Sequence, residues 1–266
     1  MWRNELSTLF RRRRTQAMLA ALAIMPIGIA LVLRFAGGPD GGEGPQFLSQ
    51  VTNNGVFAVL AGLTVTLPFF LPMAVSVVAG DAIAGEAGLG TLRYLLVRPA
   101  GRTRLLLSKS FTITAFCLAA TLVVAIAGLA AGVVLFPVAR VTTLSGDTLS
   151  LATGMVRISI AAILIGLSLI GLAAIGLFIS TLTDVPVGAM AGTLAVFILI
   201  GVLDALPQTA KIHPWLLTDH WLSYGDVLRT NILWSGIVRN LGLQALYAAV
   251  FGSAAWARLT TKDILA

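Results

Sequence analysis

Long apolar stretches separated by short polar or basic connections dominate the pattern of this 266-residue chain. A helix needs about 20 apolar residues to cross the roughly 30 Å hydrocarbon core of a bilayer. These stretches do not show the strict alternation of polar and apolar positions that is typical of membrane β-strands. The pattern therefore predicts an all-α polytopic membrane protein, with a single transmembrane domain over residues 1–266. Its six predicted spans cover approximately residues 15–34, 55–80, 110–135, 158–181, 186–204 and 236–257.

Composition and charge support this interpretation. Hydrophobic residues make up 58% of the chain and charged residues only 11%, whereas soluble domains carry about a quarter charged residues. The net charge of +7 is therefore evidence about membrane topology, and we expect no nucleic-acid partner. A cytoplasmic N-terminus places twelve Lys and Arg side chains inside, including the block 11–14, and six outside. We expect a multi-pass protein of the cytoplasmic membrane with both termini in the cytoplasm.

Two segments outside the predicted spans are expected at the membrane surface. Residues 1–14 place Trp2, Leu6 and Phe10 on one helical face among arginines. This spacing predicts an amphipathic helix on the inner leaflet; the alternative is a flexible basic leader that serves only topology. The segment 205–234 is rich in Trp and Tyr but broken by Pro and Gly. We expect this broken outer segment to lie in the interface or to dip into the bilayer before the last span.

Catalytic chemistry finds little support in the sequence. The predicted spans are almost free of ionisable residues, which argues against an ion-driven carrier. The chain has no His-Glu-x-x-His motif and no Gly-x-Ser-x-Gly motif. The segment 85–90 has two glycines at P-loop spacing, but the phosphate-binding lysine is missing. We therefore expect a non-enzymatic chain with no catalytic residue, metal site or cofactor of its own.

Helix 55–80 contains two prolines, Pro68 and Pro72, each of which removes a backbone hydrogen bond and should bend the helix. Because hydroxyl side chains lie nearby, this helix is the best candidate to line a pathway; the alternative is an ordinary packed helix with a bend. The candidate lining residues are Thr64, Thr66, Pro68, Pro72 and Ser76.

Two Gly-x-x-x-Gly pairs are candidates for close helix packing, because small residues four apart let helices approach closely. They are Gly128 with Gly132 and Gly188 with Gly192. In a chain with 27 glycines such pairs also arise by chance.

The most informative segment is the basic loop 84–109. Residues 91–97 are short and apolar-rich, Pro99 ends them, and a new helix starts near Thr103. The pattern predicts a short cytoplasmic helix on a stiff elbow, which suits docking into a groove of a soluble partner. The alternative is an interfacial helix whose charges serve only topology.

This segment resembles the loop after the second span in permease subunits of the type-2 ATP-binding-cassette (ABC) family. That family shows an acidic residue, Gly-Thr, a leucine-rich stretch, a proline followed by a basic residue, and a lysine entering the third span. The residues at these positions here are Glu86, Gly90, Thr91, Leu92, Leu95, Leu96, Pro99, Arg102 and Lys109. Six spans, an amphipathic N-terminal helix and a broken outer segment are also similar to the family.

The resemblance implies that this loop is a coupling helix that transmits ATP-driven closure of a separate nucleotide-binding subunit. Glu86 and the turn at Gly90 and Thr91 would hold the helix in place. The residues implied at the ATPase interface are Glu86, Gly90, Thr91, Leu92, Leu95, Arg98, Pro99 and Arg102.

The function implied by the resemblance is that of an ABC exporter subunit. Two copies of the chain would pair as a homodimer with two ATPase subunits, which would bind ATP and Mg. The low charge of the spans favours an amphipathic or apolar cargo, such as a drug, an antibiotic or a lipid. Two other hypotheses stay open, a non-transporting assembly or immunity module of the membrane and an ion-coupled secondary carrier.

Overall fold

The computed structural model describes residues 2–36, 51, 54–90, 101–137, 141–142 and 148–261. Within that part, the chain forms nine α-helices and one two-stranded antiparallel sheet, in which Val141 pairs with Leu149. The α-helices are α1 (Trp2–Arg11), α2 (Arg13–Ala36), α4 (Ala58–Thr66), α5 (Phe70–Gly88), α7 (Arg102–Leu135), α8 (Leu151–Ser168), α9 (Ile170–Leu182), α10 (Pro186–Ala205) and α11 (Trp234–Thr261). The short elements are η2 (Gly55–Phe57), η3 (Pro207–Thr209), η4 (His213–Trp215), η5 (Trp221–Leu228), β1 (Val141–Thr142) and β2 (Thr148–Leu149).

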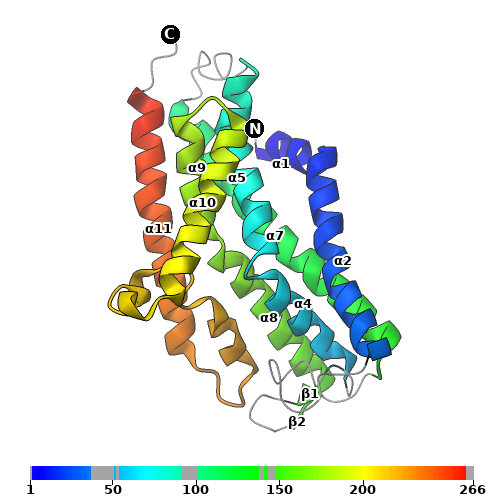
Figure 1. The fold of residues 1–266 in the computed structure, drawn as a ribbon. Coiled ribbons are helices and arrows are strands. Elements are labelled where there is room, and N and C mark those ends of the chain that lie inside the picture. Colours follow the sequence, from blue (N-terminus) through cyan, green and yellow to red (C-terminus); the bar gives the residue numbers. More distant parts are fainter. Residues whose placement is uncertain are drawn as a thin grey trace.

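The long helices lie side by side, and both ends of the chain are at the same end of the bundle (Figure 1). Helix α7 packs against α2 and α4, whereas α5 packs against α9 and α10, and α11 runs along α9. The short helix α1 crosses the bundle near the end that holds the termini (Figure 1). Apolar side chains from all these elements form one buried core.

Five helical segments are long and apolar enough to cross a membrane: α2, α5, α7, α8 with α9, and α10. By this measure the chain is a multi-pass membrane protein. The sixth predicted span falls within α11, which is long enough but less apolar, because it carries Arg239, Asn240 and Gln244 in its first half. Six spans therefore stay a prediction, with five supported by composition.

The helices extend past several predicted span boundaries. The second helical segment begins at Gly55, as predicted, but α5 continues to Gly88 and α7 already begins at Arg102. The expected bend is a break at residues 67–69, where Phe69 leaves helical geometry beside Pro68. The predicted span boundaries lie where charged residues begin in the sequence. A helix can continue into water beyond that point, so its ends need not coincide with these boundaries.

The broken outer segment is folded against the bundle. Trp221 is buried and stacks on Phe197 of α10, with 5.7 Å between ring centroids. Tyr224 is also buried and shares a hydrogen bond with Thr64 of α4, and burial raises the pKa of its hydroxyl. Figure 1 shows η5 between the lower parts of α8 and α11, so this segment packs between helices instead of covering their ends.

Candidate functional site

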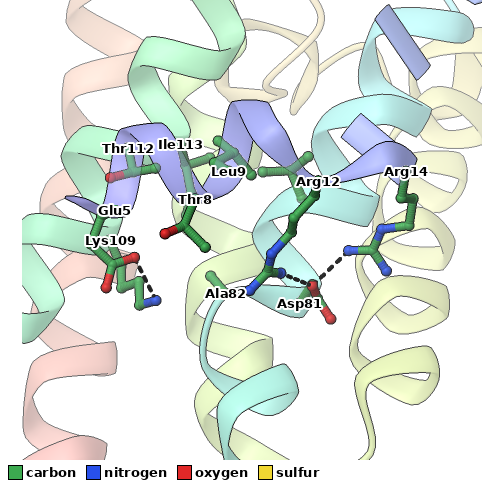
Figure 2. A pocket seen from close by; sticks show the side chains of 11 residues that line it. Glu5, Thr8, Leu9, Arg12, Arg14, Asp81, Ala82, Lys109, Thr112 and Ile113 are labelled. Atoms are coloured by element: carbon green, nitrogen blue, oxygen red, sulfur yellow. Dashed lines mark hydrogen bonds and ion pairs between the residues drawn. The ribbon is translucent and has the colours of Figure 1, made fainter. Parts of the chain in front are cut away.

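Charged side chains meet where α1 crosses α7 and α5 (Figure 2). The apolar side of α1 holds it there: the ring of Trp2 stacks on Phe111 of α7 at 5.2 Å, and Leu9 and Phe10 pack against the core. The predicted N-terminal helix is therefore attached to the bundle through its apolar residues. This attachment places its charged residues next to those of α5 and α7.

Lys109 of α7 lies at the centre of the first charged group. Its Nζ is 2.8 Å from Oε2 of Glu5 in α1 and also donates to Oε1 of Glu86 in α5. The Lys109 side chain is only 8% exposed. A charge removed from water in this way is tolerated because it is paired with opposite charges. This Lys109 cluster (Glu5, Glu86 and Lys109) joins three helices through one ammonium group.

Asp81 of α5 forms the second charged group. Its Oδ2 accepts from Arg12 Nη1 at 2.9 Å, at the junction between α1 and α2, and from Arg14 Nη2 at 2.6 Å, in the first turn of α2. Because the two arginines are about half exposed, each pair alone contributes little. This Asp81 cluster (Arg12, Arg14 and Asp81) fixes the corner between α1 and α2 against α5.

Both clusters border a small cavity of about 40 Å³. Figure 2 shows Thr8 and Leu9 of α1 on one side of it, and Asp81 and Lys109 on the others. A polar cavity of this size has room for one or two water molecules. The clusters and the cavity thus form one polar contact region beneath α1.

Between Asp81 and Glu86, α5 is held from its other side by Ser180 of α9. The Ser180 hydroxyl donates to Gly80 O at 2.7 Å and accepts from the backbone N–H of Ile83 at 3.0 Å and of Ala84 at 2.8 Å. A hydroxyl inserted into a helix ladder in this way ties the two helices together through backbone groups. The part of α5 that carries both carboxylates is therefore fixed to α9.

The first residues of α7 are tied to the end of α11. Arg102 donates to the carbonyls of Leu259 and Thr260, and Trp256 Nε1 donates to Thr103 Oγ1 at 2.8 Å. A cation is favourable at a helix C-terminus, where carbonyls lack intrahelical partners. The sequence predicted Arg102 at an ATPase interface, and the structure places its guanidinium on α11.

Other predicted interface residues are only partly visible. Glu86 lies in the Lys109 cluster, and Gly90 follows α5 with φ of +68°, a backbone conformation that favours glycine. The remaining candidates lie outside the described residues; these are Thr91, Leu92, Leu95, Arg98 and Pro99. The coupling helix itself therefore stays a prediction, while the residues on both sides of it are placed.

A comparison with known families matches a family model described as "Protein of unknown function (DUF2705)" over residues 23–265. The match covers most of the chain. The chain belongs to the DUF2705 family.

Two curated relatives of this DUF2705 chain are described as "Probable ABC transporter permease protein NosY". The protein from Pseudomonas aeruginosa is 36% identical over 107 residues, which is 40% of this chain and 35% of the relative. The protein from Stutzerimonas stutzeri is 34% identical over 107 residues, with the same coverage. The match thus spans about a third of the length of these relatives. The chain is distantly similar to ABC transporter permeases over part of its length.

The candidate pathway residues of this DUF2705 chain do not share one face. Thr66 and Ser76 are buried, and each hydroxyl donates at 2.8 Å to the carbonyl four residues earlier in its own helix. Thr64 bonds to the buried tyrosine of η5, Pro68 is exposed and Pro72 is buried. The pathway role stays a prediction.

The two glycine pairs differ in their surroundings. A Cβ on Gly132 would lie 1.9 Å from Gly55 O, and one on Gly128 would lie 3.0 Å from the backbone of α4. A Cβ on Gly188 or Gly192 would meet only ordinary contacts at 3.4 Å or more. The first pair thus lies where α7 passes closest to η2 and α4, and the second pair has more space within this chain.

A neutral polar network lies inside the bundle, and the sequence did not predict it. Asn240 donates to Ser168 Oγ at 2.6 Å, and Gln244 donates to Asn240 Oδ1 and to Leu217 O, both at 3.1 Å. Gln244 Oε1 also accepts from the N–H of Gly171, just after the break between α8 and α9. The network satisfies the N–H of Gly171 after the break and the carbonyl of Leu217, which apolar surroundings would otherwise leave unpaired.

Glu5, Asp81 and Ser180 were also missed as functional residues. Their partners lie 104, 67 to 69 and about 100 residues away in the sequence. The one signal in the sequence that could have indicated these contacts is charge. Two acidic residues lie about one and a half turns apart in α5, and the N-terminal segment of the chain is strongly basic. That signal indicates pairing without showing which basic residue is the partner.

Proposed function

We propose that this chain is the membrane-spanning permease subunit of an ABC exporter, driven by ATP hydrolysis in a separate nucleotide-binding subunit. The partial similarity to two probable ABC transporter permeases supports the proposal, as does the family resemblance of residues 86–109. The structural observation that best supports the proposal is the Lys109 cluster. It fastens α1, α5 and α7 together next to the loop on which an ATPase would act.

The loop 91–100 connects α5 to α7, so a displacement of the loop acts on both helices. At the α5 end, the Glu86–Lys109 pair passes the displacement to α7, and Glu5 passes it to α1. At the α7 end, Arg102 passes it to α11. Since Ser180 fixes α9 to the same part of α5, five helices would move together.

We further propose that two copies of the chain form a homodimer, and that both termini lie in the cytoplasm on the side of the ATPase. The cargo we propose is amphipathic or apolar, such as a drug, an antibiotic or a lipid. The apolar composition of the spanning helices supports this class of cargo. In this arrangement ATP and Mg bind to the partner, and this chain contributes no catalytic group.

The test measures ATP hydrolysis in nanodiscs, with the nucleotide-binding subunit encoded beside this chain as the partner. We expect no hydrolysis by this chain alone, and a changed rate when the partner is added to nanodiscs that contain it. Replacing residues 90–99 with a Gly/Ser segment of equal length should abolish that change. A matched replacement of residues 143–147, between β1 and β2, should preserve it. Hydrolysis by the chain alone, or an equal effect of both replacements, would contradict the proposal.

A further inference from the structure

Arg239 is an exposed cation near the start of α11, the helix that contains the sixth predicted span. Within the described part of the chain, its guanidinium makes no hydrogen bond or ion pair with another residue. The nearby basic residues differ: Arg157 donates to the carbonyls of Val227 and Arg229, and Arg229 binds Asp226 at 2.9 Å. A cation on a membrane helix is costly unless an anion or water meets it. Arg239 is therefore free to bind an anion from outside this fold.

An apolar groove runs along α11 from Arg239. It consists of two hollows, of about 260 Å³ and about 300 Å³, which share Trp215, Leu243 and Leu246 in their walls. Arg239 lines the first hollow, and Phe251 lines the far end of the second. Twelve residues separate them, which is about 18 Å along a helix. We call this feature the α11 groove.

The α11 groove has a fixed wall. Tyr247 donates its hydroxyl to Trp215 O at 2.9 Å, and its ring stacks on Phe251 with 5.9 Å between centroids. These contacts hold the Trp215 segment over α11, although the Trp215 side chain is 65% exposed. An exposed indole held over an apolar groove gives an incoming chain a rigid surface to pack against.

We propose that the α11 groove binds one anionic phospholipid, with its phosphate on Arg239 and one acyl chain along Trp215, Leu246 and Val250. The groove has a cation at one end and apolar walls over the rest, which matches the polarity of a lipid along its length. Its length of about 18 Å is close to half the roughly 30 Å hydrocarbon core, the depth of one leaflet. The lipid belongs to the leaflet opposite α1, because Arg239 lies in the half of α11 far from the C-terminus (Figure 1).

Charge favours a lipid over a second copy of this chain as the occupant. A second copy would have to bring a carboxylate to Arg239. Among the acidic residues described near this end of the bundle, Asp204 accepts from Thr218, Asp226 binds Arg229, and Asp219 lies beside His220, 3.2 Å away. A phosphodiester headgroup supplies the missing anion. This inference requires that α11 spans the bilayer, as the sequence predicts, and it is independent of the proposed ATPase partner.

The experiment uses the full chain in vesicles that contain phosphatidylglycerol or phosphatidylcholine with brominated acyl chains, which quench tryptophan fluorescence on contact. Subtracting the signal of Trp215→Phe isolates the quenching of Trp215. We expect phosphatidylglycerol to quench at about fivefold lower mole fraction than phosphatidylcholine, the effect of one basic side chain at an anionic surface. Arg239→Gln should remove this preference and Arg239→Lys should retain it.

Lys211→Gln is the matched control, since Lys211 is an exposed cation of the outer segment that does not line the groove. It should leave the preference intact. Equal quenching by the two lipids in the unaltered chain, or a preference that survives Arg239→Gln, would overturn the proposal. A second copy as the occupant would show as a disulfide between two Val250→Cys chains, and this outcome would also overturn it.

Discussion

At the scale of single residues, the molecule depends on charges that lie far apart in the sequence and meet in the fold. Lys109 is the clearest case, because it is nearly buried and contacts carboxylates from two other helices. Replacing one member of such a group lowers the folding stability by more than the whole group contributes to it. The reason is that the remaining charges stay buried and lose their partner. The Lys109 cluster is therefore a sensitive point for stability.

We predict that Lys109→Met destabilises the protein by about 3 kcal/mol, the lower end of the range for breaking a buried ion pair, because Glu5 and Glu86 would lose the cation between them. Thermal unfolding in detergent measures the effect as a fall of several degrees in the midpoint. The double variant Lys109→Met with Glu86→Gln should recover part of the loss, since it removes the repulsion. Lys211→Gln should stay within about 0.5 kcal/mol of the unaltered chain. An unchanged unfolding midpoint for Lys109→Met would show that the cluster does not contribute to stability.

At the scale of elements, close helix approaches depend on residues without side chains. Helix α7 passes η2 so closely at Gly132 that any Cβ would overlap the carbonyl of Gly55. Backbone cannot yield as a flexible side chain can, so the helices would have to separate. Around Gly192 a Cβ would meet only Ile179 at 3.4 Å, an ordinary contact. Each glycine is the second residue of a Gly-x-x-x-Gly pair, and only the packing distinguishes the two positions.

We predict opposite outcomes for alanine at these two positions. Gly132→Ala should destabilise the protein by about 1–3 kcal/mol, the usual cost of overpacking a tight contact. Gly192→Ala should be neutral or stabilising, because alanine favours the helix by about 1 kcal/mol over glycine. Chemical unfolding of the two variants in the same detergent compares them directly. Equal destabilisation of both would contradict the close approach of α7 to η2.

At the scale of the whole molecule, the sequence predicted the all-α class, a helix start at Gly55, the bend near Pro68 and the broken segment before α11. These features follow from local properties: apolar length, proline chemistry and aromatic content. Local patterns could not show that Lys109 meets Glu5, or that Ser180 inserts into α5, because these contacts depend on how distant helices pack. The same limit applies to α11, where Asn240 and Gln244 reduce the apolar signal and find partners only in the folded bundle.

Contacts between distant residues connect the helices of the bundle into one mechanical unit. The helices at the end with both termini are fastened to one another near the end of α5 and the start of α7, and the opposite end is packed by the outer segment (Figure 1). A subunit that binds the connection between these two helices, residues 91–100, would therefore act on most of the bundle.

Affinity purification of the full chain from its native membranes, with mass-spectrometric identification of bound proteins, tests this central claim most directly. We predict that a subunit with a P-loop and an ABC signature motif co-purifies with the unaltered chain and with the 143–147 replacement, and is lost from the 90–99 replacement. An ABC ATPase that binds all three equally would contradict the assignment of the loop as the coupling segment. Recovery of the folded chain with no ABC ATPase bound would contradict the permease function itself.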